Sequence, residues 1–64
     1  MPVITVEGPK INDTERKRKL VASITEAAYE AYGLPRSVYV VYIKENNPDN
    51  VAVGGELLCD RDKK

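Results

Sequence analysis

Histidine, tryptophan and phenylalanine are absent from this chain of 64 residues, and Cys59 is its only cysteine. Without histidine there is no imidazole to act as a general base or to complete a zinc site, and a single thiol cannot form an internal disulfide bond. The groups that ordinarily titrate near neutrality are therefore the lone thiol and the amine at the start of the chain. Cys59 has no histidine to activate it as a nucleophile, so the N-terminal amine is the candidate base. The composition also predicts no metal site.

Long hydrophobic runs and an excess of either charge are also missing. The longest apolar stretch, residues 38–43, is far too short to cross a membrane, and no basic segment followed by an apolar one indicates a signal peptide. Ten basic residues balance ten acidic ones, whereas general nucleic-acid binders usually carry a basic excess. We therefore expect a cytoplasmic protein that has neither a membrane nor a nucleic acid as its partner.

The length of the chain limits the size of its hydrophobic core. Sixty-four residues favour one domain, spanning residues 1–64, and a domain of this size buries only about 60% of the surface that its unfolded chain exposes. Small domains are usually stabilised further by disulfides, metals or association with other chains. Because the composition argues against the first two, the sequence predicts a homo-oligomer.

A strand and the start of a helix are expected in the first part of the chain. Residues 3–6 are rich in β-branched side chains and are followed by a Gly-Pro turn signal. Asn12 or Asp13 can cap a helix, and Asn12 with Glu15 has the spacing of a capping box. The sequence thus predicts a short first strand, a turn and a capped helix.

The helix is expected to continue to Tyr32. Gly33 suits the left-handed position that follows a helix, and Pro35 cannot continue one. Apolar residues recur at helical intervals, which predicts one stripe facing a sheet. The members of this stripe are Leu20, Val21, Ile24, Ala27, Ala28 and Ala31.

The second half of the chain is expected to supply another strand and an arm. Residues 37–45 form an apolar run without alternation, which is typical of a strand buried on both faces, and Glu45 at its end is interpreted as a solvated charge. Two strands joined by a helix form a right-handed unit with parallel strands, so the expected fold class is α/β with a β-α-β protomer. One sheet face and the sheet edges remain open, so we expect the sheet to be completed by a neighbouring subunit. Residues 51–55 are predicted to form a short C-terminal β arm with a glycine bend, and residues 56–64 a frayed, charged tail.

Pro2 is the residue with the most unusual acid–base chemistry. Once Met1 is removed, its nitrogen is a free secondary amine at the start of a strand. An apolar surround disfavours the charged ammonium and lowers the pKa of such an amine toward neutrality, where a general base works best. If Met1 is retained, the nitrogen is a tertiary amide and cannot accept a proton.

Several segments together resemble the 4-oxalocrotonate tautomerase family, in particular its short members known as DmpI. They are MPVITV at residues 1–6, the capped helix with LVASI at 20–24, LP at 34–35 and VGGEL at 53–57. The resemblance covers nearly the whole chain. It implies dimers with a four-stranded sheet that assemble into a hexamer as a trimer of dimers. It also implies an isomerase that catalyses cofactor-free keto–enol tautomerisation of a small 2-hydroxydienoate or 2-oxo acid, with Pro2 as the general base.

The chain departs from the family at the residues that bind the substrate. The two family arginines that hold the substrate carboxylates and polarise its carbonyl fall at Asn12 and Val40, and neither residue offers a guanidinium. Lys10 and Arg36 are the substitutes that we predict as anion-binding, substrate-binding residues. Two alternatives stay open. One is an oligomeric binding or scaffold protein with weak or no tautomerase activity, and the other is a related proline-dependent hydratase or dehalogenase.

Overall fold

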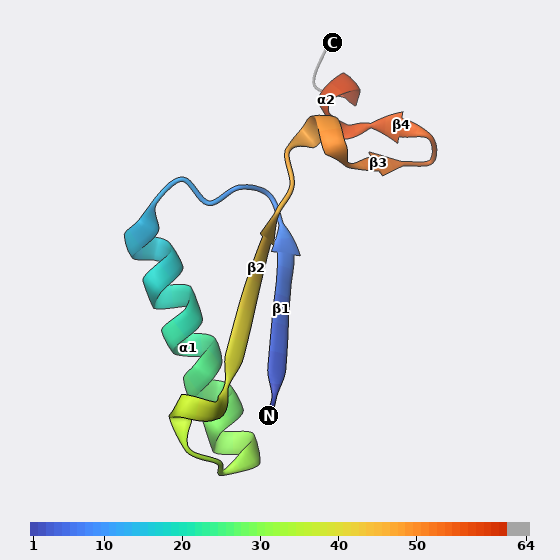
Figure 1. Ribbon diagram of the computed structural model, residues 1–64. Coiled ribbons are helices and arrows are strands. Elements are labelled where there is room, and N and C mark those ends of the chain that lie inside the picture. Colours follow the sequence, from blue (N-terminus) through green and yellow to red (C-terminus); the bar gives the residue numbers. More distant parts are fainter. Residues whose placement is uncertain (62–64) are drawn as a thin grey trace.

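The computed structural model describes residues 1–61 and shows a β-α-β unit followed by an arm (Figure 1). Strand β1 (Val3–Gly8) and strand β2 (Val40–Glu45) pair in parallel, with Val3 opposite Val40 and Gly8 opposite Glu45. Helix α1 (Thr14–Tyr32) connects them. The predicted α/β class, element order and parallel pairing are confirmed. Within the described range, no helix is long and apolar enough to cross a membrane.

Local chemistry at both ends of α1 explains where the helix begins and stops. The Asp13 carboxylate accepts the Glu15 backbone N–H at 2.9 Å, so Asp13 is the cap and the capping box expected from Asn12 is not formed. At the other end Gly33 adopts a left-handed conformation (φ 72°) and donates its N–H to the Tyr29 carbonyl oxygen at 2.8 Å. The predicted end at Tyr32 is confirmed.

Helix α1 lies against one face of the two-stranded sheet (Figure 1). Along β1, exposed and half-buried side chains alternate, so that every second residue turns toward the helix. Ala27 and Ala31 of the predicted stripe are exposed, so the helix buries a narrower stripe than expected. The half-buried residues between the helix and the sheet are Ile4, Val6, Leu20, Val21, Ile24, Ala28, Val41 and Ile43.

The prediction that the second strand begins at residue 37 is wrong. Arg36–Val38 instead forms a short 3-10 helix, η1, and β2 begins at Val40. The reason is the register of the sheet. The Val40 N–H reaches the Pro2 carbonyl oxygen at 3.0 Å, and β1 offers no pairing partner before that point. The N–H groups of Val38 and Tyr39 therefore bond backward, to the carbonyl oxygens of Pro35 and Arg36.

Residues 56–61 belong to an ordered arm, whereas the sequence predicted a frayed tail beginning at residue 56. After a 3-10 turn, η2 (Pro48–Asn50), strands β3 (Ala52–Val53) and β4 (Glu56–Leu57) form an antiparallel hairpin, and a single helical turn, α2 (Leu58–Arg61), follows. The hairpin turn consists of two glycines with φ of 62° and 84°, which is the backbone that a two-residue hairpin favours. The predicted β arm is confirmed, while the part of the predicted tail at residues 62–64 lies outside the described residues.

The unit has only half of a hydrophobic core. None of residues 1–61 is fully buried, and the sheet face opposite α1 leaves Val3 and Tyr42 each 56% exposed. The radius of gyration is 15.4 Å, against about 11 Å for a compact chain of this length. The arm extends away from the β-α-β unit (Figure 1), so it covers neither face of the β1–β2 sheet.

The cap at Gly33 allows a direct test of the local conformation. Nothing lies within 4 Å of a Cβ placed at this position, so Gly33→Ala changes only the backbone energy. We expect it to lower the free energy of unfolding by about 1–2 kcal/mol, measured by thermal unfolding at one protein concentration. Gly33→Asn is the matched control and should cost less, because asparagine tolerates the left-handed region. Equal stability of Gly33→Ala and wild type would contradict this assignment.

Candidate active site

Pro2 lies immediately before β1 and is held in place by the neighbouring strand. Its carbonyl oxygen accepts the Val40 N–H at 3.0 Å, and the residue is half-buried. Met1 is 85% exposed, so its removal costs no packing within the chain. Removal would leave a secondary amine fixed at the end of the β1–β2 sheet.

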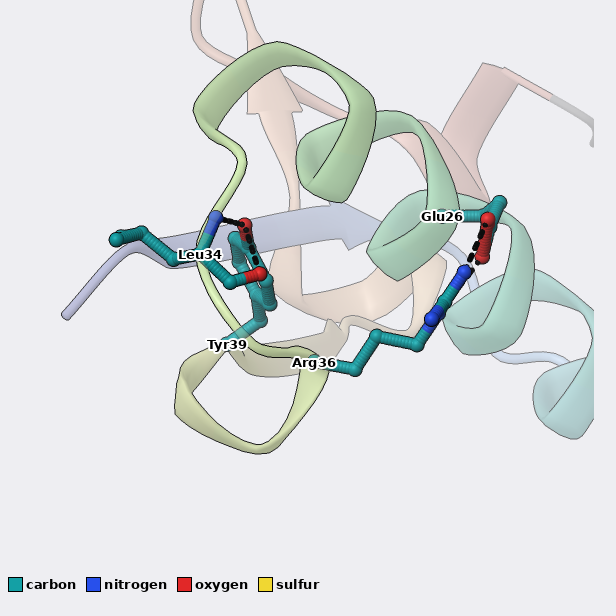
Figure 2. Close-up of polar contacts among 4 residues, drawn as sticks. All are labelled: Glu26, Leu34, Arg36 and Tyr39. Carbon is teal, nitrogen blue, oxygen red and sulfur yellow. Dashed lines mark hydrogen bonds and ion pairs between the residues drawn. The ribbon is translucent and has the colours of Figure 1, made fainter.

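Tyr39 fastens the start of β2 to the end of α1. Its hydroxyl accepts the Leu34 N–H and donates to the Leu34 carbonyl oxygen, both at 3.1 Å (Figure 2). Its ring lies 6.4 Å from that of Tyr32, tilted by 51°, an arrangement that aromatic pairs favour. Tyr39 therefore fixes the segment directly before Val40.

Arg36 is engaged by the helix rather than free in solution. Its Nε–H and Nη2–H donate to the two carboxylate oxygens of Glu26 at 2.9 and 2.7 Å (Figure 2). Its guanidinium lies 4.0 Å from the centre of the Tyr29 ring. The hydrogen bond from Arg36 lowers the pKa of Glu26, and the same bond raises the pKa of Arg36. No local sequence pattern indicates this contact, because ten residues and a chain reversal separate the partners.

Lys10 lies at the opposite end of β1 from Pro2. It belongs to the connection between β1 and α1, and among residues 1–61 it forms no ion pair. Six strand residues span about 20 Å, so one chain does not bring Pro2 and Lys10 together. Arg36 precedes β2, and because the strands are parallel it lies at the same end as Pro2.

Glu45 is a structural contact, so its interpretation as a solvated charge is wrong. Its Oε2 accepts the Ile11 N–H at 2.8 Å and lies 3.0 Å from Nζ of Lys17. The Ile11 hydrogen bond is the main cause that lowers the pKa of Glu45, followed by Lys17. This carboxylate ties the connection after β1 and the start of α1 to the end of β2.

A hollow of about 380 Å³ opens where the ends of both strands meet the arm. It lies at the far end of β1 from Pro2, so within one chain the hollow and the candidate base are separate. Among residues 1–61 no group of three potential metal ligands occurs. The hollow is lined mostly by apolar atoms of Glu7, Gly8, Pro9, Asn46, Pro48, Val51 and Leu58.

The fold defines a small α/β protein made of one β-α-β unit, with a proline directly before its first strand. Comparison with known proteins identifies the family. Residues 2–61 match the family described as "Tautomerase enzyme". The chain is 40% identical over 60 residues to the 2-hydroxymuconate tautomerase of Bacillus subtilis (strain 168), which covers 94% of this chain and 97% of that protein. The protein therefore belongs to the tautomerase family.

Solved structures agree with this assignment. The crystal structure of DmpI from Archaeoglobus fulgidus shares 44% identity with a TM-score of 0.80, covering 92% of this chain and all of that chain (100%). A heterohexameric 4-oxalocrotonate tautomerase from Chloroflexus aurantiacus shares 25% identity with a TM-score of 0.80, covering 94% of this chain and 97% of that chain. The resemblance of the sequence to 4-oxalocrotonate tautomerases is thus confirmed.

The contacts of Glu45 predict a pH-dependent stability. A folded pKa below the ordinary value of 4.5 means that the ionised group stabilises the fold above that pH, and that this contribution is lost as the pH falls through the folded pKa. Glu45→Gln should therefore lower the thermal midpoint at pH 7, and the difference from wild type should shrink below about pH 4.5.

Glu30→Gln is the matched control, because the Glu30 carboxylate makes no hydrogen bond or ion pair with the described residues. Its thermal midpoint should follow that of wild type at every pH. A deficit of Glu45→Gln that is the same at pH 7 and pH 3 would contradict the role of the ionised carboxylate.

Proposed function

We propose that the protein is an isomerase that catalyses cofactor-free keto–enol tautomerisation of a small 2-hydroxydienoate or 2-oxo acid, with Pro2 as the general base. The observation that carries this proposal is the family match, which begins at residue 2 and extends through the described chain. The 40% identity to a protein named 2-hydroxymuconate tautomerase supports the substrate class. The position of Pro2, held at the end of the sheet by Val40, supports its role.

The reaction needs one group that accepts and returns a proton. The neutral Pro2 amine takes the proton of the enol hydroxyl, the oxygen electron pair forms the carbonyl, and the double bonds shift along the conjugated chain. The resulting ammonium then returns a proton to carbon, so the product has the same atoms as the substrate. A base of this kind contributes about 10²–10⁴-fold to a rate when its pKa lies near the working pH.

The surroundings of Pro2 must exclude water for this chemistry, and the single chain does not provide them. Pro2 is only half-buried, and Val3 beside it is 56% exposed. We propose that neighbouring copies cover the open sheet face and complete the site, in the hexamer that the family resemblance implies. Burial by these copies would lower the pKa of the amine from its ordinary range of about 7.7–8.0.

The two predicted anion-binding residues, Lys10 and Arg36, would reach a substrate in different ways. Lys10 is too far along β1 to serve the Pro2 of its own chain, so it would contact the substrate of a neighbouring one. Arg36 lies at the correct end, and because Glu26 occupies its Nε and one hydrogen of Nη2, it would bind a substrate carboxylate through its remaining N–H groups. Both roles remain predictions.

A binding or scaffold protein of the same fold is the second candidate. It is favoured by the engagement of Arg36 and by the lack of a guanidinium at Asn12 and Val40, since these features weaken carboxylate recognition. A proline-dependent hydratase or dehalogenase would keep Pro2 and change the substrate. Turnover of a panel of enol acids and unsaturated acids separates these functions from tautomerisation.

The role of Pro2 is tested by blocking its nitrogen. Protein whose intact mass shows loss of Met1 should convert 2-hydroxymuconate or phenylenolpyruvate, followed by ultraviolet absorbance. A form that retains Met1 keeps every other side chain but has an amide nitrogen at Pro2, and its rate should fall about 100-fold or more. Pro2→Ala should also be slower, to a smaller degree because it keeps a primary amine. Equal rates in all three proteins would exclude Pro2 as the base.

Assembly is tested by placing a charge on the open sheet face. Wild type should sediment at several times the 7.1 kDa mass of one chain at micromolar concentration. Tyr42→Asp should dissociate it, because an unpaired carboxylate would be buried where Tyr42 is now 56% exposed. Ala27→Asp, on the exposed side of α1, is the control and should leave the mass unchanged. A stable wild-type monomer would contradict the proposed assembly.

A further inference from the structure

We propose that Glu26 and Arg36 form a positioning pair that holds the Pro2 end of the sheet, and that Arg36 serves the reaction through this pair rather than as a ligand of the substrate. The inference rests on the proposed function of Pro2. It assigns a task to Glu26, a residue that lies on α1 and contacts neither Pro2 nor β1 through any hydrogen bond of the described residues.

A short series of contacts connects the pair to Pro2. Arg36 is the first residue of η1, and its carbonyl oxygen accepts the Tyr39 N–H at 3.3 Å. The next residue, Val40, donates its N–H to the Pro2 carbonyl oxygen at 3.0 Å. The position of Pro2 therefore depends on where η1 lies, and the side chain of Arg36 fixes η1 to α1.

Tyr39 provides a second attachment of the same segment. Its two hydrogen bonds to Leu34 hold the C-terminal side of η1, while Arg36 holds the N-terminal side (Figure 2). With one end attached to Glu26 of α1 and the other to Leu34, just after the helix cap, η1 cannot shift without breaking one of these contacts. The arrangement fixes the start of β2 although β1 and β2 are not paired before Val40.

The geometry of the pair makes this exposed contact stronger than an ordinary surface ion pair. A single exposed ion pair usually contributes little, but a bidentate guanidinium–carboxylate pair retains more of its strength. Arg36 also lies on the face of Tyr29, which adds a cation–π attraction. Glu26 accepts from Nε and from one hydrogen of Nη2, so the pair fixes the orientation of the guanidinium and with it the place of η1.

The test compares Glu26→Gln and Arg36→Lys with Glu15→Gln in protein that has lost Met1. Glu15 is also a carboxylate of α1 paired with an arginine, Arg18, so its variant matches the chemical change without touching η1. We expect the first two variants to lower kcat about fivefold to tenfold, less than the roughly 100-fold loss that a misplacement of one ångström can cause, with KM changed less than about twofold. The Glu15 variant should keep both constants.

A second measurement requires no substrate. Hydrogen exchange of the Val40 amide, followed by NMR, should become faster in Glu26→Gln and Arg36→Lys and remain unchanged in Glu15→Gln. The double variant Glu26→Arg with Arg36→Glu, which reverses the pair, should restore part of kcat and of the protection. Because exchange reports only on the end of the sheet, it decides the positioning role even if Pro2 is shown not to be the base.

Three results would overturn the inference. A lower KM in Glu26→Gln with unchanged kcat would show that the released guanidinium binds the substrate. Unchanged exchange of the Val40 amide in both variants would show that the pair does not hold the Pro2 end. Full activity of Arg36→Lys would likewise exclude the need for a bidentate contact.

Discussion

The fold depends on the packing of one helix against one face of a two-stranded sheet. This contact makes Ile4, Val41 and their neighbours half-buried, yet no residue of the described chain is fully buried. Hydrophobic stabilisation follows the apolar area that is removed from water, so half of a core stabilises a chain only weakly. The proposed association of chains is therefore a condition for folding as well as for activity.

The same constraint governs the chemistry. Parallel pairing places Pro2 and η1 at one end of the sheet, and Lys10, Glu45 and the hollow at the other. Each end is rigid for its own reason, since Tyr39 and Arg36 attach one to α1 and Glu45 attaches the other. In our proposal the site combines groups that a single chain keeps apart, so assembly and catalysis are linked.

Features determined by local chemistry could be predicted from the sequence. The end of α1 follows from Gly33 and the residues after it, and the β-α-β order follows from hydrophobic periodicity. Features determined by contacts across the chain could not. The start of β2 depends on its register with β1, and the contact between Arg36 and Glu26 requires the chain to reverse after α1. Within the proposed site, the role of Pro2 could be predicted from its position in the sequence. No local pattern indicates a role for Glu26.

The central claim is that Pro2 acts as a base only where neighbouring copies complete its surroundings. Dilution tests it directly, by following specific activity toward an enol acid and the sedimenting mass of the same Met1-free protein over one range of concentration. The proposal predicts that activity and assembly are lost together, at the same concentration. A dissociated single chain that keeps its full rate would contradict it.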